Sequence, residues 1–314
     1  MRVLALVPGG IRDQLQIFTT LTTIKATYPN ADIAVVVEPI SKSAYRVSKA
    51  VSEIIPFSYQ GKNSPADWAN LLGIIRDREF ELVLCASDRW EEAVMLWLSG
   101  IPTRIGYSSA QASWLYTHTV TAAAQQYPTS QYQALLQGLA MPAPSAPIEL
   151  NVPERDINWA DEQRQVLGVA DSGYVVMYPG LNMQAEDYPL DSWVAIIDDF
   201  QSKQPQLAVV VLETADSEDF VAVLSRQRSL KMVEASNLGQ VAAILAGADL
   251  VISPDSYVSQ VATALQVFTL VLQTKQSKAL PPASGETRVL GVQSATDKLA
   301  DIKPGDVLQK VWGG

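Results

Sequence analysis

The sequence predicts an α/β fold built as two halves, each organised around a parallel sheet. Short apolar runs that favour strands alternate with longer helix-like stretches along the 314 residues, a pattern typical of parallel βαβ units. A proline-rich stretch, residues 141–147, interrupts the alternation, which then restarts. Hydrophobic residues make up 48% of the chain, which is enough for two cores. We therefore expect domains at residues 1–147 and 148–314.

The first half shows its strands as apolar or β-branched runs and its turns as glycine and proline. The elements expected, in chain order, are a strand at Val3–Val7, a helix from the Gly9-Gly10 turn to Tyr28, strands at Ile33–Val37 and Leu82–Cys85, a helix from Trp90 to Leu98 that ends at Gly100, and a strand at Ile101–Tyr107.

The second half repeats this style after the proline-rich stretch, without repeating the sequence. The elements expected there are strands at Val175–Tyr178, Leu207–Leu212, Leu250–Ile252 and Thr269–Leu272, and helices at Trp193–Phe200, Leu238–Leu245 and Gln260–Leu265. Four tryptophans of the chain are expected to pack the cores in preference to lining a cleft; they are Trp90, Trp97, Trp114 and Trp193.

Composition excludes several classes of function. The first 150 residues carry 11 basic against 12 acidic residues and the remainder 12 against 21, so the net charge of -10 lies almost entirely in the second half and disfavours nucleic acid as a partner. No apolar run is long enough for a transmembrane helix, and the N-terminus fits a strand better than a signal peptide. One cysteine, Cys85, and one histidine, His118, exclude an intramolecular disulfide and a multi-histidine metal site. A cytoplasmic protein is the simplest interpretation.

Three blocks of sequence occur in an order and spacing that resemble one family. They run from Arg2 through Gly9-Gly10-Ile11-Arg12-Asp13 to Tyr28-Pro29-Asn30-Ala31-Asp32-Ile33, from Phe80 through Leu84 to Gly100–Tyr107, and from Tyr178-Pro179-Gly180 through Tyr188–Trp193 to Ser253-Pro254-Asp255-Ser256. Together they resemble glycosyltransferase family 9, the ADP-heptose:lipopolysaccharide heptosyltransferase-like enzymes. The resemblance implies two Rossmann-like domains facing a cleft, the GT-B architecture, with the acceptor on residues 1–147 and the nucleotide-sugar mainly on residues 148–314.

On the acceptor side the resemblance assigns a catalytic role to Asp13. As general base it would take a proton from the acceptor hydroxyl while that oxygen attacks the anomeric carbon and inverts it. Gly9, Gly10 and Arg12 would form the loop around it; Arg12 stands where the family usually has glycine, and pairing with it would weaken Asp13 as a base. The residues alone leave a second interpretation open, in which Asp13 only favours the N-terminus of a helix.

On the donor side the resemblance assigns five residues, namely Gly180, Asp255, Ser256, Gln260 and Lys275. The family's Asp-Ser-Gly-x-x-His element opens a helix whose first amides receive a pyrophosphate. In this chain Tyr257 replaces the glycine and Gln260 the histidine, and we expect the tyrosine ring to occupy part of the donor's volume. Helix capping remains the alternative role for Asp255 and Ser256.

Other donor-side positions also depart from the family pattern. The lysine usual before a Trp-Pro pair is replaced by Met183-Gln184-Ala185-Glu186-Asp187, which carries two acids. The glycines expected after a strand are replaced by Leu212-Glu213-Thr214-Ala215-Asp216. Lys275 and Lys278 would supply substitute phosphate contacts, or else are ordinary solvated charges.

Two functions are therefore weighed. The first is inverting transfer of a sugar, heptose in the family, from an ADP-linked nucleotide-sugar to a lipopolysaccharide-type glycolipid acceptor at the inner membrane face, with no cofactor and no metal. The second is a catalytically degenerate GT-B scaffold that acts as a protein-interaction or regulatory module. The loss of the family's lysine, glycine and histidine on one side of the cleft favours the degenerate scaffold. The presence of Asp13 favours sugar transfer. A small-molecule receptor is a third class, with no motif of its own.

Overall fold

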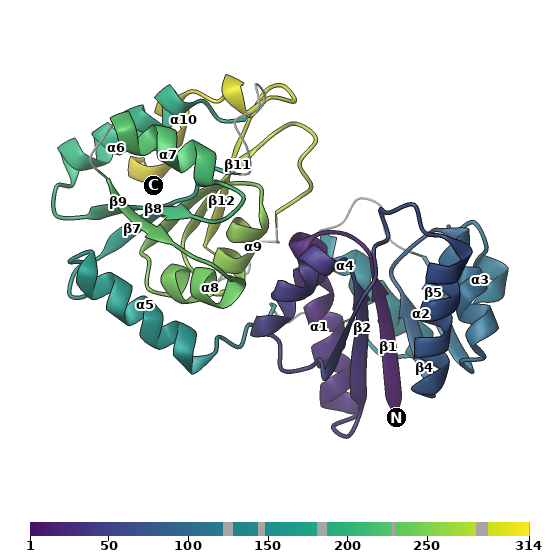
Figure 1. Cartoon of the computed structure of the whole chain (residues 1–314). Helices are drawn as coiled ribbons and strands as arrows, with labels where there is room; N and C mark the ends of the chain where they lie inside the picture. Colours follow the sequence, from purple (N-terminus) through teal and green to yellow (C-terminus); the bar gives the residue numbers. More distant parts are fainter. Residues whose placement is uncertain (122–127, 144–147, 181–186, 228–229, 281–287, 314) are drawn as a thin grey trace. The chain divides into compact units, whose positions relative to one another are not determined.

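The computed structural model describes residues 1–121, 128–143, 148–180, 187–227, 230–280 and 288–313 (Figure 1). The chain divides into two compact units, Met1–Asn151 and Val152–Gly314, whereas the sequence places the boundary between residues 147 and 148. Part of the expected linker, residues 144–147, lies outside the described residues. Among the helices that the structure describes, none is long and apolar enough to cross a membrane.

The first unit is a six-stranded sheet in the order β3-β2-β1-β4-β5-β6 with every pair parallel. Its strands are β1 (Arg2–Val7), β2 (Asp32–Val37), β3 (Glu53–Pro56), β4 (Leu82–Cys85), β5 (Thr103–Tyr107) and β6 (His118–Val120). Its helices are α1 (Ile11–Thr27), α2 (Pro65–Asp77), α3 (Trp90–Ser99) and α4 (Pro128–Gln133), with 3-10 turns η1 (Pro39–Val47), η2 (Ser113–Leu115) and η3 (Ala134–Leu139).

Helices cover both faces of this sheet, α2 and α3 on one and α1 and α4 on the other (Figure 1). That coverage explains why β1 reads as one continuous apolar run: Val3–Val7 is buried at every position, as expected of a central parallel strand. Leu71 of α2 and Leu96 of α3 pack with Leu4 and Leu6 in one core.

The second unit repeats the topology, with the order β12-β11-β10-β7-β8-β9, all parallel. Its strands are β7 (Tyr174–Met177), β8 (Ala208–Glu213), β9 (Lys231–Glu234), β10 (Leu250–Pro254), β11 (Thr269–Gln273) and β12 (Val289–Gln293). Its helices are α5 (Glu154–Val166), α6 (Leu190–Lys203), α7 (Glu218–Gln227), α8 (Leu238–Ala246), α9 (Tyr257–Ala264), α10 (Pro304–Trp312) and the 3-10 turn η4 (Leu299–Asp301). Both sheets thus have the Rossmann order 3-2-1-4-5-6, and the predicted α/β class with two Rossmann-like domains is confirmed.

Every element expected from the sequence is present, but some limits were wrong. Helix α6 begins at Leu190 and α9 at Tyr257, three residues before the expected Trp193 and Gln260, because Pro189 and Ser256 occupy the N-cap positions. The sequence did not single out several further elements. These are β3, α2, β6, α4, α5, α7, β9, β12 and α10.

The expectation that four tryptophans pack the cores is correct only for Trp193, which is 1% exposed. Trp90, Trp97 and Trp114 are 52%, 54% and 80% exposed. Helix α3 is apolar on both faces, so its composition does not show which face meets the sheet. It buries the face that carries Ala93 and turns the tryptophans to solvent.

Candidate functional site

The carboxyl edge of each sheet brings together the residues assigned from sequence. In an open parallel sheet, ligands bind at this edge, where the strand order reverses. The reversal lies between β1 and β4 in the first unit and between β7 and β10 in the second. The Gly9–Asp13 loop follows β1, Gly180 follows β7, and the Asp255-Ser256 pair follows β10. Each unit therefore has a candidate site at its own switch point.

In the first unit, Asp13 is held in the first turn of α1 by two hydrogen bonds. Its Oδ2 accepts from the Gly10 amide at 3.0 Å, and its Oδ1 accepts from the Tyr132 hydroxyl at 3.1 Å. The first bond caps the helix, because Asp13 is the third helical residue and Gly10 is the N-cap. Burial, helped by the Asp13 charge, raises the pKa of Tyr132, so this hydroxyl remains a donor. Arg12 is half-buried beside them in the same turn.

Buried polar side chains fix the loop in front of Asp13. Gln14 donates from Nε2 to the Val7 carbonyl at 2.9 Å and accepts from the Tyr45 hydroxyl at 2.7 Å. Ser41 donates to the Gly9 carbonyl at 2.9 Å. The loop is therefore rigid before any ligand arrives, which suits a site that must hold one geometry.

Gly9 is required in this loop, and its replacement by alanine should destabilise the first unit. Its φ is +107°, a conformation that favours glycine, and an added Cβ would lie 2.3 Å from Asp13 Oδ2. We expect a loss of roughly 1–3 kcal/mol in the free energy of unfolding, measured by urea denaturation. Gly10→Ala is the matched control: φ there is -82° and an added Cβ meets nothing within 4 Å. Equal losses in the two variants would contradict this account.

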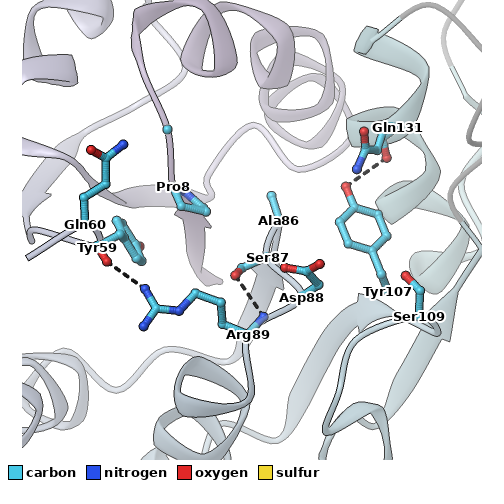
Figure 2. Close-up of a pocket in the computed structure, with 11 residues that line it drawn as sticks. Pro8, Tyr59, Gln60, Ala86, Ser87, Asp88, Arg89, Tyr107, Ser109 and Gln131 are labelled. Carbon is cyan, nitrogen blue, oxygen red and sulfur yellow. Dashed lines mark hydrogen bonds between the residues drawn. The ribbon is translucent and has the colours of Figure 1, made fainter.

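A pocket of about 390 Å³ opens at the carboxyl edge of the first sheet (Figure 2). Its walls come from the ends of four strands and from α4; they are Pro8, Gly9, Tyr59, Gln60, Ala86, Ser87, Asp88, Arg89, Tyr107, Ser109 and Gln131. Arg89 is anchored by a 2.7 Å bond from Nη1 to the Tyr59 carbonyl, and the Tyr107 hydroxyl donates to the Gln131 carbonyl at 3.1 Å. Hydroxyl, amide, carboxylate and guanidinium groups suit a polar, hydroxyl-bearing ligand. Gly9 lines this pocket and Asp13 does not.

Behind the pocket wall lies a buried carboxyl group, Glu92. Its side chain has no exposed surface, and neither oxygen has a well-formed hydrogen bond within the described residues. Arg89 Nε is 3.9 Å from its Oε1. Burial raises the pKa of Glu92 to about 7, although Ser87 and Arg89 act in the opposite direction. Burial also raises the pKa of the neighbouring Cys85 thiol to about 12, so this cysteine is unreactive.

The sequence did not single out the pocket residues beyond Gly9, nor Tyr132. Ser87, Asp88 and Arg89 had a usable signal, because they directly follow the apolar run Leu82–Cys85 and must emerge at the carboxyl edge. Tyr132 had none: it reaches Asp13 across 119 residues of sequence.

In the second unit, the start of α9 is filled by the chain's own side chains. Tyr257 is only 9% exposed, and its ring lies edge-on to Tyr178, with centroids 6.2 Å apart. Ser256 caps the helix: its hydroxyl accepts from the Ser259 amide at 3.5 Å, and in return its own amide donates to Ser259 Oγ at 3.1 Å. Burial raises the pKa of Tyr257, so the ring is neutral. This arrangement supports the capping role of Ser256 that the sequence left open.

The remaining donor-side residues surround this helix start. Gly180 has φ +103° and follows β7; Asp255 is half-buried and Gln260 is buried, and both have interaction partners within the chain. Lys275 is exposed in the turn after β11, the neighbour of β10. The substitution of acids for a lysine at residues 183–187 lies outside the described residues except for Asp187.

Acidic side chains add negative charge to the carboxyl edge of the second sheet. Glu213 and Glu234 are paired in register at the ends of β8 and β9. Burial, Glu234 and Glu218 together raise the pKa of Glu213, which reports an unfavourable environment for negative charge. Within the described ranges, no group of three or more histidine, cysteine, aspartate or glutamate side chains is arranged to hold a metal ion.

Comparison with protein families identifies a match that covers most of the chain. Residues 68–311 match the family described as "Glycosyltransferase family 9 (heptosyltransferase)", which is more than half of the chain.

Solved structures show the same fold. A glycosyltransferase of family 9 from Veillonella parvula has a TM-score of 0.83 at 15% identity, covering 98% of this chain and 95% of its own. The E. coli heptosyltransferase WaaC with ADP-2-deoxy-2-fluoro heptose has a TM-score of 0.77 at 18% identity, covering 99% of each chain.

The chain is also similar in sequence to a protein whose name does not refer to glycosyl transfer. The "Photosynthetic NDH subunit of subcomplex B 1, chloroplastic" of Arabidopsis thaliana is 23% identical over 337 residues, which cover 98% of this chain and 72% of the relative.

Proposed function

The chain belongs to glycosyltransferase family 9 and has its heptosyltransferase-like fold, and from this premise we propose that it is a non-catalytic member. In this proposal the two-domain scaffold serves protein binding, and the nucleotide-sugar site of the second unit is closed. The observation that carries the proposal is the buried ring of Tyr257 at the first position of α9.

The argument begins with what a nucleotide-sugar needs. A pyrophosphate binds at a helix N-terminus because the first amides are unpaired and the helix dipole favours an anion, and it needs close approach to the backbone. Glycine at the first helical position permits that approach, whereas this chain has Tyr257 there, with a buried ring that packs on Tyr178. In this proposal a ligand has to displace that ring before it reaches the amides.

Charge supports the same proposal. The second half has 21 acidic against 12 basic residues, and Glu213 and Glu234 add acids to the edge where a diphosphate would lie. Lys275 is exposed to solvent, where screening leaves a single cation little influence. The Arabidopsis relative is named as a subunit of a larger assembly, and this supports a role in protein binding for a chain that matches it over 98% of its length.

A second candidate, sugar transfer, is favoured by the first unit. Its polar pocket lies next to the Gly9 loop, and Asp13 is fixed beside it. In this candidate the donor is an ADP-linked sugar such as the one bound to the E. coli neighbour, and the acceptor is a lipopolysaccharide-type glycolipid reached from the cytoplasmic face of the inner membrane. Asp13 would act as base without a metal or cofactor.

Calorimetric titration separates the two candidates. The chain is titrated with ADP, with an ADP-linked sugar and with UDP-linked sugars at millimolar concentration. The proposal predicts no saturable heat with any of them. Saturable binding that Ser256→Tyr abolishes would reject the proposal and favour transfer, and Asp13→Asn should then remove turnover while leaving donor affinity intact.

A further inference from the structure

One guanidinium group holds the wall of the pocket in the first unit. Arg89 Nη1 donates to the Tyr59 carbonyl at 2.7 Å, and the Arg89 main-chain amide donates to Ser87 Oγ at 3.3 Å (Figure 2). All three residues line the pocket. Arg89 Nη2 also lies 3.2 Å from Oε1 of the half-buried Glu91. A movement of this guanidinium therefore changes both the shape and the charge of the wall.

The buried carboxyl group of Glu92 lies next to the same guanidinium without a close bond to it. Arg89 Nε is 3.9 Å from Glu92 Oε1, about 1 Å longer than the charge-assisted bonds of roughly 2.7–2.9 Å that such pairs form. A neutral carboxyl group tolerates this spacing, whereas a buried carboxylate needs a close partner. The observed arrangement is therefore that of the protonated acid.

The titratable groups that face Glu92 from other elements stay neutral. They are Cys85 at the end of β4, Tyr59 after β3 and Tyr116 after η2. Burial raises the pKa of each of them, to about 12 for the thiol. At the start of its own helix, Asp88 and Glu91 oppose ionisation of Glu92, whereas Arg89 favours it. Among these neighbours, Arg89 is therefore the cation that can stabilise an ionised Glu92.

Arg89 cannot make close bonds to Tyr59 and Glu92 without moving. Because the guanidinium is rigid and planar, bringing Nε about 1 Å closer to Glu92 also displaces Nη1. We propose that ionisation of Glu92 draws Arg89 from the Tyr59 carbonyl to the Glu92 carboxylate, so that a single proton controls the wall of the pocket. Glu92 acts here as a positioning residue, since it does not line the pocket itself.

The two states offer different groups to a ligand. With Glu92 protonated, Arg89 and the Tyr59 carbonyl satisfy each other at the wall. With Glu92 ionised, the Tyr59 carbonyl becomes available to a ligand that donates a hydrogen bond, and the cation withdraws from the exposed Asp88. Burial raises the pKa of Glu92 to about 7, so the first state dominates below pH 7 and the second above it. The inference concerns the first unit alone and holds whether or not the second unit binds a nucleotide.

Nuclear magnetic resonance of the full chain tests the coupling. Labelling tyrosine carbonyls with ¹³C and glutamine amides with ¹⁵N selects the two Tyr-Gln peptide groups of the sequence, Tyr59-Gln60 and Tyr132-Gln133. The Tyr59 signal should shift as the pH rises, with a midpoint near 7, because its carbonyl loses the bond from Arg89. Above the midpoint, exchange of the Arg89 Nε–H with water should be at least about tenfold slower than in Glu92→Gln, because the proton is then held by a buried carboxylate.

Three variants separate this movement from other effects of pH. Glu92→Gln should keep the Tyr59 signal at its low-pH position, because glutamine cannot ionise. Glu91→Gln is the matched control and should keep the transition with its midpoint at lower pH, since the Glu91 charge opposes ionisation of Glu92. Arg89→Gln should abolish the response, because the group that moves is gone. A Tyr59 signal that is constant in wild type, or that responds equally in Glu92→Gln or Arg89→Gln, overturns the proposal.

Discussion

Glu92→Gln is expected to gain stability relative to wild type as the pH rises, by roughly 2–3 kcal/mol between about pH 5 and pH 8. The pKa of Glu92 is raised by burial from 4.5 to about 7, so the folded state favours the protonated form. Wild type keeps the full stability of the protonated carboxyl below pH 4.5 and loses it as the pH rises through 7. Glutamine cannot ionise, so the variant does not share that loss.

Urea denaturation across this pH range measures the effect as the difference between variant and wild type. A constant offset from the new amide cancels, because only the trend with pH is used. Glu91→Gln is the neighbouring control. Burial acts to raise the pKa of Glu91, but hydrogen bonds with its own backbone and with Arg89 hold that pKa below its ordinary value. The Glu91→Gln variant should therefore lose stability relative to wild type as the pH rises. A flat difference for Glu92→Gln would show that the carboxyl is hydrated in the folded protein.

Trp193→Ala is expected to destabilise the second unit by about 3–5 kcal/mol. Trp193 is 1% exposed and lies at 90° to the Tyr188 ring, with centroids 5.3 Å apart, in a core shared with Phe200. Alanine would leave a cavity that the parallel sheet and α6 are too rigid to fill. Calorimetric unfolding should show the loss in the transition of the second unit.

Trp193→Phe is the matched variant for this prediction. Within the described residues, Nε1 of Trp193 has no hydrogen-bond acceptor, so removing the indole N–H sacrifices no bond. Phenylalanine should therefore cost well under half as much as alanine. Equal losses in the two variants would mean that the indole nitrogen has an acceptor and that packing is not the main contribution.

The fold was predictable because its buried parallel strands are short apolar runs that alternate with longer helix-like stretches. Val3–Val7 and Leu82–Cys85 are of this kind, and both are strands of the sheet. Elements such as α5, with only two buried residues, leave little hydrophobic pattern to detect. The exposed face of α3 could not be predicted, because tryptophan is ordinarily a core residue and nothing local shows which face meets the sheet.

The residues of the candidate sites were predictable where a local pattern marks them, and not where long-range packing places them. Glycines at strand ends, Gly9 and Gly180, carry a local signal, and both have positive φ. The partners of Asp13 depend on long-range packing, since Tyr132 comes from α4. The sequence predicts only that the Tyr257 ring occupies part of the donor's volume; its contact with Tyr178 depends on the register of β7 and β10. The structure shows Asp13 capping the start of α1, and its catalytic role stays a prediction.

Hydrogen exchange at the start of α9 tests the central claim most directly, because it reports on the amides that a pyrophosphate would use. Exchange of the segment 254–262 is compared with and without millimolar ADP. If the Tyr257 ring and the Ser256–Ser259 cap close this helix start, exchange in the segment is unchanged by ADP and becomes faster in Tyr257→Gly. Slowing of wild-type exchange by ADP in this segment would contradict the account and identify a working nucleotide site.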